Sequence, residues 1–215
     1  MKASFKLRPK PEISAAFVFP CASVDEAHDL LLKVYGSSLR PVALEALDGR
    51  LKHIIDGAAL AIVGVEGTRP VIDRHYRELR DLAPRLGILE NERAEPLWNS
   101  LRKLPDALKD YVRVRIGAKP HELKKLLPQA PLWISAGTGI ARADLEAASD
   151  LHFSLRRMAD KTAALGGYLV TESAPPTMAN RDKLIWAAPG EQPLMKGLRA
   201  LRDPKKLLNP GKVTV

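Results

Sequence analysis

The chain has 215 residues, of which 46% are hydrophobic and 5% aromatic, and its formal net charge is +9. This length suffices for one globular domain, or one and a half, with a substantial core. The single cysteine, Cys21, excludes a disulfide framework and a cysteine-based metal site, and it favours a reduced, cytoplasmic setting. No run of about 18 apolar residues occurs, so we expect no membrane span.

The positive charge raises the question of a polyanionic partner. The basic residues are scattered, however, and each basic cluster is interleaved with acidic or apolar residues. The aromatic residues are few and form no stacking platform of the kind found in RNA-recognition motifs. We therefore predict a solvated basic surface and no nucleic-acid partner.

The first part of the chain alternates between strand and helix patterns. Residues 1–12 are extended and broken by prolines, which indicates a linker. Residues 13–20 predict a strand, and Ser23 with Glu26 forms a capping box for a helix that ends near residue 35. The next predicted elements are strands at 41–48 and 60–66, a helix at 70–86 with proline in its first turn, and a helical piece at 93–103.

The second part repeats this alternation. The clearest strand pattern in the chain is the alternating sequence of residues 111–116, YVRVRI. A helix is predicted at 119–127, followed by a hairpin of residues 131–135 and 140–145 around Gly137-Thr138-Gly139, a long amphipathic helix at 149–165 and a strand at 167–172. Two passes of a β-α-β-β-α-β-like unit predict an α+β fold, a ferredoxin-like duplication with a mostly antiparallel sheet and helices on one face.

The C-terminal segment, residues 194–215, has the most distinctive pattern. Leu194, Leu198 and Leu201 recur at helical spacing and form a narrow apolar stripe. Asp203-Pro204 predicts the end of this helix, because the residue before a proline disfavours the α conformation. Leu207-Leu208 is expected to return to a core, and Asn209-Pro210-Gly211 predicts a tight turn. A C-terminal segment with a predicted helix, helix end and turn is expected to be held in place rather than frayed.

This segment resembles the carboxyl end of FAD-linked oxidases of the vanillyl-alcohol-oxidase type. Leu194-Met195-Lys196, Asp203-Pro204 and Asn209-Pro210-Gly211-Lys212 match in order and spacing. Residues 5–12 are similar to the segment that leaves the FAD-binding domain of these oxidases and enters their cap domain. The resemblance is greatest to the FAD-binding subunit of bacterial glycolate oxidase. It extends over most of the chain, but the matching residues are sparse.

The resemblance implies a division into three parts: residues 1–12 as a linker from a missing FAD-binding domain, 13–190 as an α+β cap or substrate domain, and 191–215 as a segment that returns to the FAD domain. It also implies an FAD-dependent oxidase or dehydrogenase of a small, glycolate-like 2-hydroxy acid. FAD would be bound mainly by a domain or subunit outside this chain, with Asn209 and Lys212 as cofactor contacts. On this reading the chain is inactive alone, and its oligomeric state is open.

The sequence offers few other catalytic candidates. Gly137-Thr138-Gly139 precedes a strand rather than a helix, so it indicates a turn and not a dinucleotide site. The five histidines stand singly, as surface or packing residues: His28, His53, His75, His121 and His152. The metal-dependent members of the resembling family carry HxGDGNxH in the hairpin, whereas this chain keeps the glycines and lacks both histidines. We therefore predict no divalent metal, and no general base is identified.

Arginines are the candidate substrate contacts. Arg113 and Arg115 lie two residues apart on one strand, so both face the same way. A guanidinium binds a carboxylate in a bidentate manner, which suits a 2-hydroxy acid. A solvated sheet face explains the pair equally well, and Arg142 is a weaker candidate of the same kind. The competing functional class is a stand-alone α+β binding module, either for nucleic acid or for a small molecule.

Overall fold

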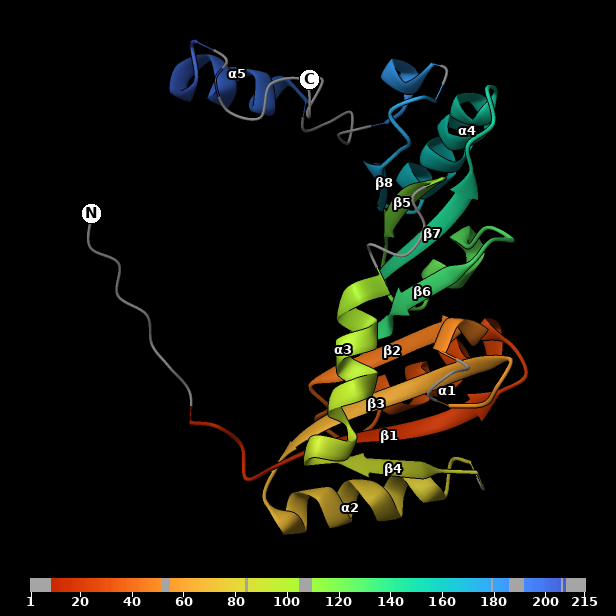
Figure 1. The fold of residues 1–215 in the computed structure, drawn as a ribbon, viewed down its shortest axis with the longest axis vertical. Coiled ribbons are helices and arrows are strands. Elements are labelled where there is room, and N and C mark those ends of the chain that lie inside the picture. The colour runs from red at the N-terminus through yellow and green to blue at the C-terminus, as the bar shows by residue number, and fades with distance from the viewer. Residues whose placement is uncertain are drawn as a thin grey trace. The chain divides into compact units, whose positions relative to one another are not determined.

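The computed structural model describes residues 9–51, 55–83, 85–104, 110–178, 180–185, 192–205 and 207. It divides the chain into two compact units, Met1–Arg102 and Lys103–Val215, each with four of the eight strands (Figure 1). The predicted α+β class is confirmed, with antiparallel strands in both units.

The first unit contains a four-stranded sheet in the order β4-β1-β3-β2. Its strands are β1 (Ile13–Cys21), β2 (Ala43–Asp48), β3 (Ala59–Gly67) and β4 (Gly87–Glu90). Helix α1 (Val24–Tyr35) contacts β1, β2 and β3, and α2 (Arg69–Arg80) contacts β1 and β3. This order and connectivity are those of the ferredoxin-like β-α-β-β-α-β unit that the sequence pattern predicts.

The start of α1 follows from its capping residues. The Ser23 hydroxyl accepts a hydrogen bond from the backbone N–H of Glu26 at 3.2 Å. The Glu26 carboxylate reaches back and accepts from the N–H of Ala22 at 2.7 Å, one residue before the position used in a standard capping box. The reciprocal pair satisfies two backbone donors and fixes where the helix begins.

Helix α3 (Glu95–Lys103) lies against the opposite face of the first sheet from α2. A Cβ atom at Gly64 would lie 3.1 Å from the Trp98 ring of α3, whereas Phe17, paired with Val63, has its ring centroid 6.5 Å from that of Tyr76 in α2. Because neighbouring residues of a strand face opposite ways, the two helices cover different faces, and the expectation of helices on one face only is wrong for the first unit. Figure 1 shows α1 behind these strands and α3 in front of them.

The helix predicted at 70–86 is too long. Helix α2 ends at Arg80, and Gly87–Glu90 form the edge strand β4, which pairs with β1. Ile72, His75 and Leu79 are the buried residues of α2, while Leu82 is 41% exposed and falls off the buried face. Pairing with β1 is a tertiary effect, so the four-residue strand leaves little local signal.

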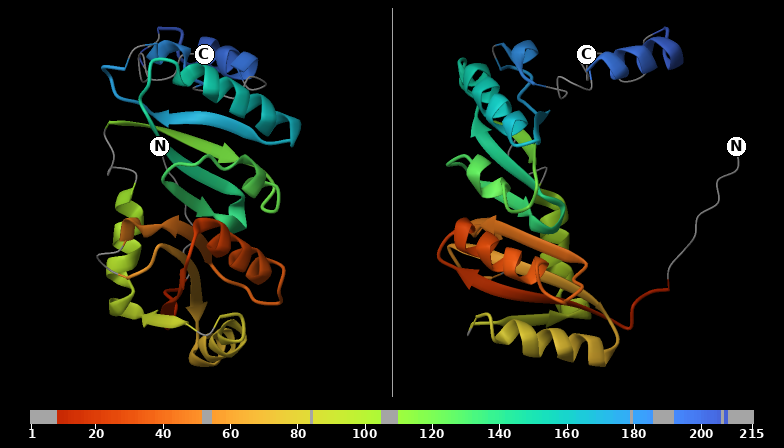
Figure 2. Two further views of the ribbon diagram at one scale, coloured as in Figure 1. Left: turned by 90° about the vertical axis from the view of Figure 1, so that its right-hand side faces the viewer. Right: turned by 180° about the vertical axis from the view of Figure 1, so that it is seen from behind.

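The second unit has a sheet in the order β6-β7-β5-β8, which is the same connectivity read from the other edge. Its strands are β5 (Tyr111–Gly117), β6 (Leu132–Ser135), β7 (Ile140–Glu146) and β8 (Tyr168–Ser173). Helix α4 (Leu151–Ala164) contacts β8 and lies along one side of the sheet (Figure 2).

A helix predicted at 119–127 is replaced by a single 3₁₀ turn, η4 (Leu123–Leu126). Leu123 and Leu126 are both buried, and their spacing of three residues suits the 3₁₀ geometry, in which such side chains eclipse. Leu127 precedes a proline and is extended, which prevents a longer helix.

The C-terminal helix α5 (Gln192–Arg202) ends before Asp203-Pro204, as its sequence predicts. Asp203 is buried, and its carboxylate accepts a hydrogen bond from the N–H of Leu207 at 2.8 Å. The expectation that Leu207 returns to a core is wrong, because this residue is 72% exposed. Leu208 and the turn at Asn209 lie outside the described residues.

Candidate functional site

The polar residues of the second unit gather on one face of its sheet. Val112, Val114 and Ile116 of β5 are fully buried and face away from that surface. Arg113 and Arg115 alternate with them, and in the register of β5 with β7 Arg113 lies opposite Asp144 and Arg115 opposite Arg142. All three predicted substrate arginines therefore lie on the same face, which we call the polar face of the second unit.

Arg113 is held in an internal ion pair. Its Nε donates to Asp144 Oδ1 at 2.6 Å, and its Nη2 donates to Asp144 Oδ2 at 3.0 Å and to the carbonyl of Leu104 at 3.1 Å. The exposed fractions of the two side chains are 7% and 2%. Since the Arg113 guanidinium is buried and already bound bidentately to a carboxylate, its role is structural, and it is not available to contact a ligand.

Arg115 and Arg142 meet at a third residue, Glu172 of β8. Arg142 Nε donates to Glu172 Oε2 at 3.0 Å, and Arg115 Nε lies 3.6 Å from Glu172 Oε1. The exposed fractions of these side chains are 37% for Arg115, 23% for Arg142 and 26% for Glu172. The two guanidinium groups thus flank one carboxylate at a half-exposed surface.

Aromatic rings orient both guanidinium groups. The Arg142 Cζ atom lies 5.0 Å from the centroid of the Trp133 ring, and the Arg115 Cζ atom lies 5.6 Å from that of Tyr168. These distances are typical of cation–π contacts, which restrict the flexible arginine side chains. Gly117 makes room for Tyr168, because a Cβ atom at this position would overlap the Tyr168 ring.

The cluster has more hydrogen-bond donors than acceptors. Arg115 Nε is shielded from solvent and has no hydrogen-bond partner among the described residues. A guanidinium carries several N–H donors in a planar fork, and within the described part of the chain Glu172 is the polar partner of both groups. The unused donors, the positive charge and the partial exposure make this cluster a candidate anion site.

Sequence reasoning missed Glu172, Tyr168 and the role of Trp133. The alternation of β8 places Tyr168 and Glu172 on one face, but their proximity to Arg115 depends on the pairing of β8 with β5, which is not a local feature of the sequence. The predicted cofactor contacts, Asn209 and Lys212, lie outside the described residues.

Other reactive groups in the described residues point elsewhere. Cys21 is buried, and burial, followed by the nearby charge of Glu26, raises the pKa of its thiol, which makes it a poor nucleophile. No cluster of three or more histidine, cysteine or acidic side chains suited to a metal occurs in the described part of the chain. Nor does any helix there have the length and apolar character needed to cross a bilayer.

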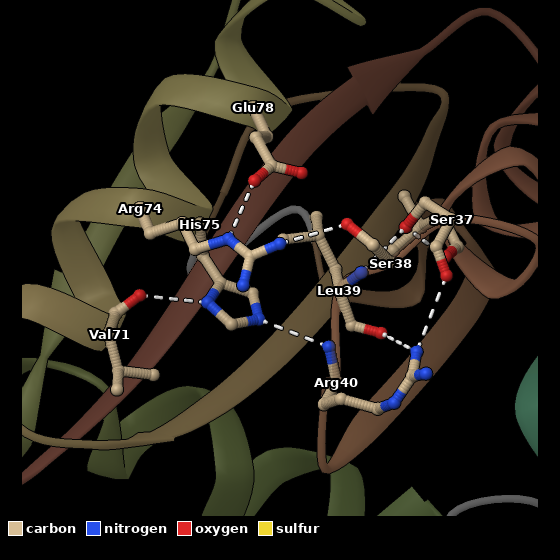
Figure 3. Close-up of polar contacts among 9 residues, drawn as sticks. Ser37, Ser38, Leu39, Arg40, Val71, Arg74, His75 and Glu78 are labelled. Carbon is tan, nitrogen blue, oxygen red and sulfur yellow. Dashed lines mark hydrogen bonds and ion pairs between the residues drawn. The ribbon is translucent and has the colours of Figure 1, made fainter.

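A second polar cluster in the first unit joins the loop after α1 to α2 (Figure 3). His75 Nδ1 donates to the carbonyl of Val71 at 2.8 Å, and its Nε2 accepts from the N–H of Arg40 at 3.4 Å. Arg74 donates to the hydroxyl of Ser38 at 2.9 Å. Because His75 is 5% exposed and both ring nitrogens are used within the fold, this cluster anchors a loop and is not a candidate for chemistry.

Comparison with known proteins adds no identification. None of the protein-family models matches the chain, and no curated protein matches it in sequence.

Proposed function

We propose that the chain is the cap, or substrate, domain of an FAD-dependent oxidase or dehydrogenase that acts on small, glycolate-like 2-hydroxy acids. FAD would be bound mainly by a domain or subunit outside these 215 residues. The observation that carries the proposal is the Arg115–Arg142 pair on the polar face of the second unit, with its surplus of donors. An arginine pair could bind the carboxylate of many substrates. The resemblance of the C-terminal segment to FAD-linked oxidases is the reason for proposing the oxidation of a 2-hydroxy acid.

The role of the arginines in such a reaction is binding and orientation. A guanidinium holds a carboxylate through two parallel hydrogen bonds, which fixes the direction in which the α-carbon points. FAD, when bound, would supply the redox chemistry by accepting a hydride from that carbon. The residues of this chain would hold the carboxylate in the bound ligand and exclude water around it.

The hairpin glycines support a site that uses arginine in place of a metal. Arg142 stands three residues after Gly139, where the metal-dependent pattern HxGDGNxH has its second histidine. Gly139 adopts φ +67°, and a Cβ atom there would clash with the carbonyl of Ala118, so the turn requires glycine. The turn sets the start of β7 and thereby the position of Arg142, whose permanent charge supplies the cation.

The exposed residues of helix α5 support the proposal that this chain contacts another domain or subunit. Leu194, Leu198 and Leu201 are 67%, 51% and 71% exposed, although they form one apolar stripe. Exposed apolar stripes of this kind are typical of contact surfaces. Under the proposal this stripe contacts the FAD-binding domain. The described residues of this chain contain no glycine-rich strand-to-helix turn of the dinucleotide-binding type, so FAD would have to be bound by that other domain.

Two measurements on the purified chain test the proposal. After incubation with FAD and gel filtration, we expect no flavin absorbance in the protein fraction. In calorimetry we expect glycolate to bind, and we expect Arg115→Met with Arg142→Met to weaken binding by about tenfold or more, since each charged hydrogen bond contributes about 1.5–3 kcal/mol. The control is Arg157→Met, an exposed arginine of α4.

A tightly bound flavin in the isolated chain, or glycolate binding that survives loss of both arginines, would contradict the proposal. Strong, salt-sensitive binding to random DNA would instead favour the stand-alone module.

A further inference from the structure

Glu172 is already a carboxylate ligand of the two arginines. Each of its oxygens faces a different guanidinium, Oε2 at 3.0 Å from Arg142 Nε and Oε1 at 3.6 Å from Arg115 Nε. Glu172 belongs to β8, whereas the arginines belong to β5 and β7. The pairing of these strands holds the Glu172 carboxylate between the two guanidinium groups. A bound anion would therefore share the guanidinium groups with a resident negative charge.

The local charge is set by these three groups. Two guanidinium groups and one carboxylate leave a net charge of one positive unit. The neighbouring pair on the same face, Arg113 with Asp144, is neutral overall because its bidentate contact joins one positive and one negative group. Glu172 thus decides whether the site offers one positive charge or two.

We propose that Glu172 makes the site selective for ligands with a single carboxylate over ligands with two, an inference that rests on the proposed function and specifies its substrate class. The first carboxylate of a ligand finds free donors on the two arginines. A second carboxylate on a short ligand would lie near the Glu172 carboxylate without a cation of its own. Like charges at such range repel, and in a half-exposed site water reduces this repulsion without removing it.

The selectivity is testable without flavin. The side-chain Nε–H signals of Arg115 and Arg142 in nuclear magnetic resonance spectra of the full chain, assigned with Arg→Lys variants, report titrations with sodium glycolate and sodium malonate at constant ionic strength. Glu172→Gln removes the negative charge and keeps the shape. We expect this substitution to raise the ratio of malonate affinity to glycolate affinity by about fivefold. This is the effect of one unit charge at a contact distance in water.

Two variants separate this role from a general change in charge. Glu172→Asp keeps the charge and should keep the wild-type preference. Glu122→Gln is a matched control, because Glu122 is 23% exposed and pairs with Lys125 at 2.7 Å elsewhere in the second unit. This variant should change the affinities for the two anions by equal factors.

If Glu172→Gln changes both affinities equally, or if Glu122→Gln shifts the preference as much, Glu172 does not set the selectivity, while the arginine anchor of the proposed function stands. If neither anion moves the Arg115 and Arg142 signals, the inference and the anchor both fail. If the preference shifts as expected but the isolated chain binds FAD tightly, the inference holds and the cap-domain proposal fails.

Discussion

Arg113 and Arg115 show how two residues of the same type and spacing take different roles. Both lie on the same face of β5, and each has an acidic side chain within reach. Arg113 meets Asp144 in a buried bidentate pair, whereas Arg115 shares Glu172 with Arg142 at a longer distance and remains 37% exposed. Burial and partner geometry, rather than residue type, decide which arginine is free to meet a ligand.

The buried pair of Arg113 and Asp144 is expected to stabilise the fold only while both charges are present. Asp144→Asn leaves the buried guanidinium of Arg113 without its counter-charge, and we expect a loss of about 3 kcal/mol in the free energy of unfolding, measured by urea denaturation. The double variant Arg113→Met with Asp144→Leu removes both charges and should recover most of that loss. A double variant less stable than Asp144→Asn would contradict this role for the pair.

At the scale of the elements, the strands of the second unit are positioned by close contacts at glycine. Gly117 of β5 lies under the Tyr168 ring of β8, and Gly139 turns the chain into β7. These two contacts set the strands that carry Arg115 and Arg142. The site therefore depends on residues that contribute no functional group.

Gly117→Ala tests this dependence. The new Cβ atom would overlap the Tyr168 ring, so the ring must move and the contact of Arg115 with it is lost. We expect a destabilisation of about 1–3 kcal/mol in thermal unfolding, together with weaker glycolate binding. Gly87→Ala in β4 is the control, because its Cβ atom would meet only an ordinary contact 3.7 Å away. Equal effects of the two substitutions would show that Gly117 has no special role.

The edge strand β4 is joined to α2 by an ion pair with a pH dependence. Arg69 donates to both carboxylate oxygens of Glu90, at 2.8 and 2.9 Å, and this hydrogen bonding lowers the pKa of Glu90 below its ordinary value of 4.5. A carboxyl group with a lowered folded-state pKa favours folding when it is ionised. The contribution is present above the unfolded-state pKa and is lost as the pH falls through the lowered value.

We expect the free energy of unfolding of Glu90→Gln to be lower than that of the wild type at about pH 7. At about pH 2 the two should be nearly equal, because the Glu90 carboxyl group is then protonated in both the folded and the unfolded chain. Urea denaturation at the two pH values measures the difference. Glu66→Gln, an exposed residue of β3, should show no such change. A difference for Glu90→Gln that stays constant with pH would exclude the ion pair as its cause.

At the scale of the whole molecule, the sequence predicted the class of fold because local signals agree with it. The capping box at Ser23, the alternation of β5 and the turn at Gly139 all act over a few residues, and the helix, strand and turn that these three signals predict are present. The edge strand β4 and the short turn η4 were missed because their form depends on tertiary pairing and packing.

The candidate site was only partly predictable for the same reason. The sequence identified Arg113, Arg115 and Arg142 as polar residues of one sheet region. It gave no means of telling that Asp144 neutralises the first, or that Glu172 joins the other two, because both facts depend on strand register. Residues that act through pairing between distant strands leave no local pattern.

The binding of glycolate by Arg115 and Arg142 can be mapped on the full chain by nuclear magnetic resonance. We expect glycolate to shift the side-chain signals of Arg115 and Arg142 and the backbone signals around Glu172, and to leave the side-chain signals of Arg113 and Arg157 unchanged. Shifts confined to the first unit, or equal shifts of all exposed arginines, would contradict this expectation.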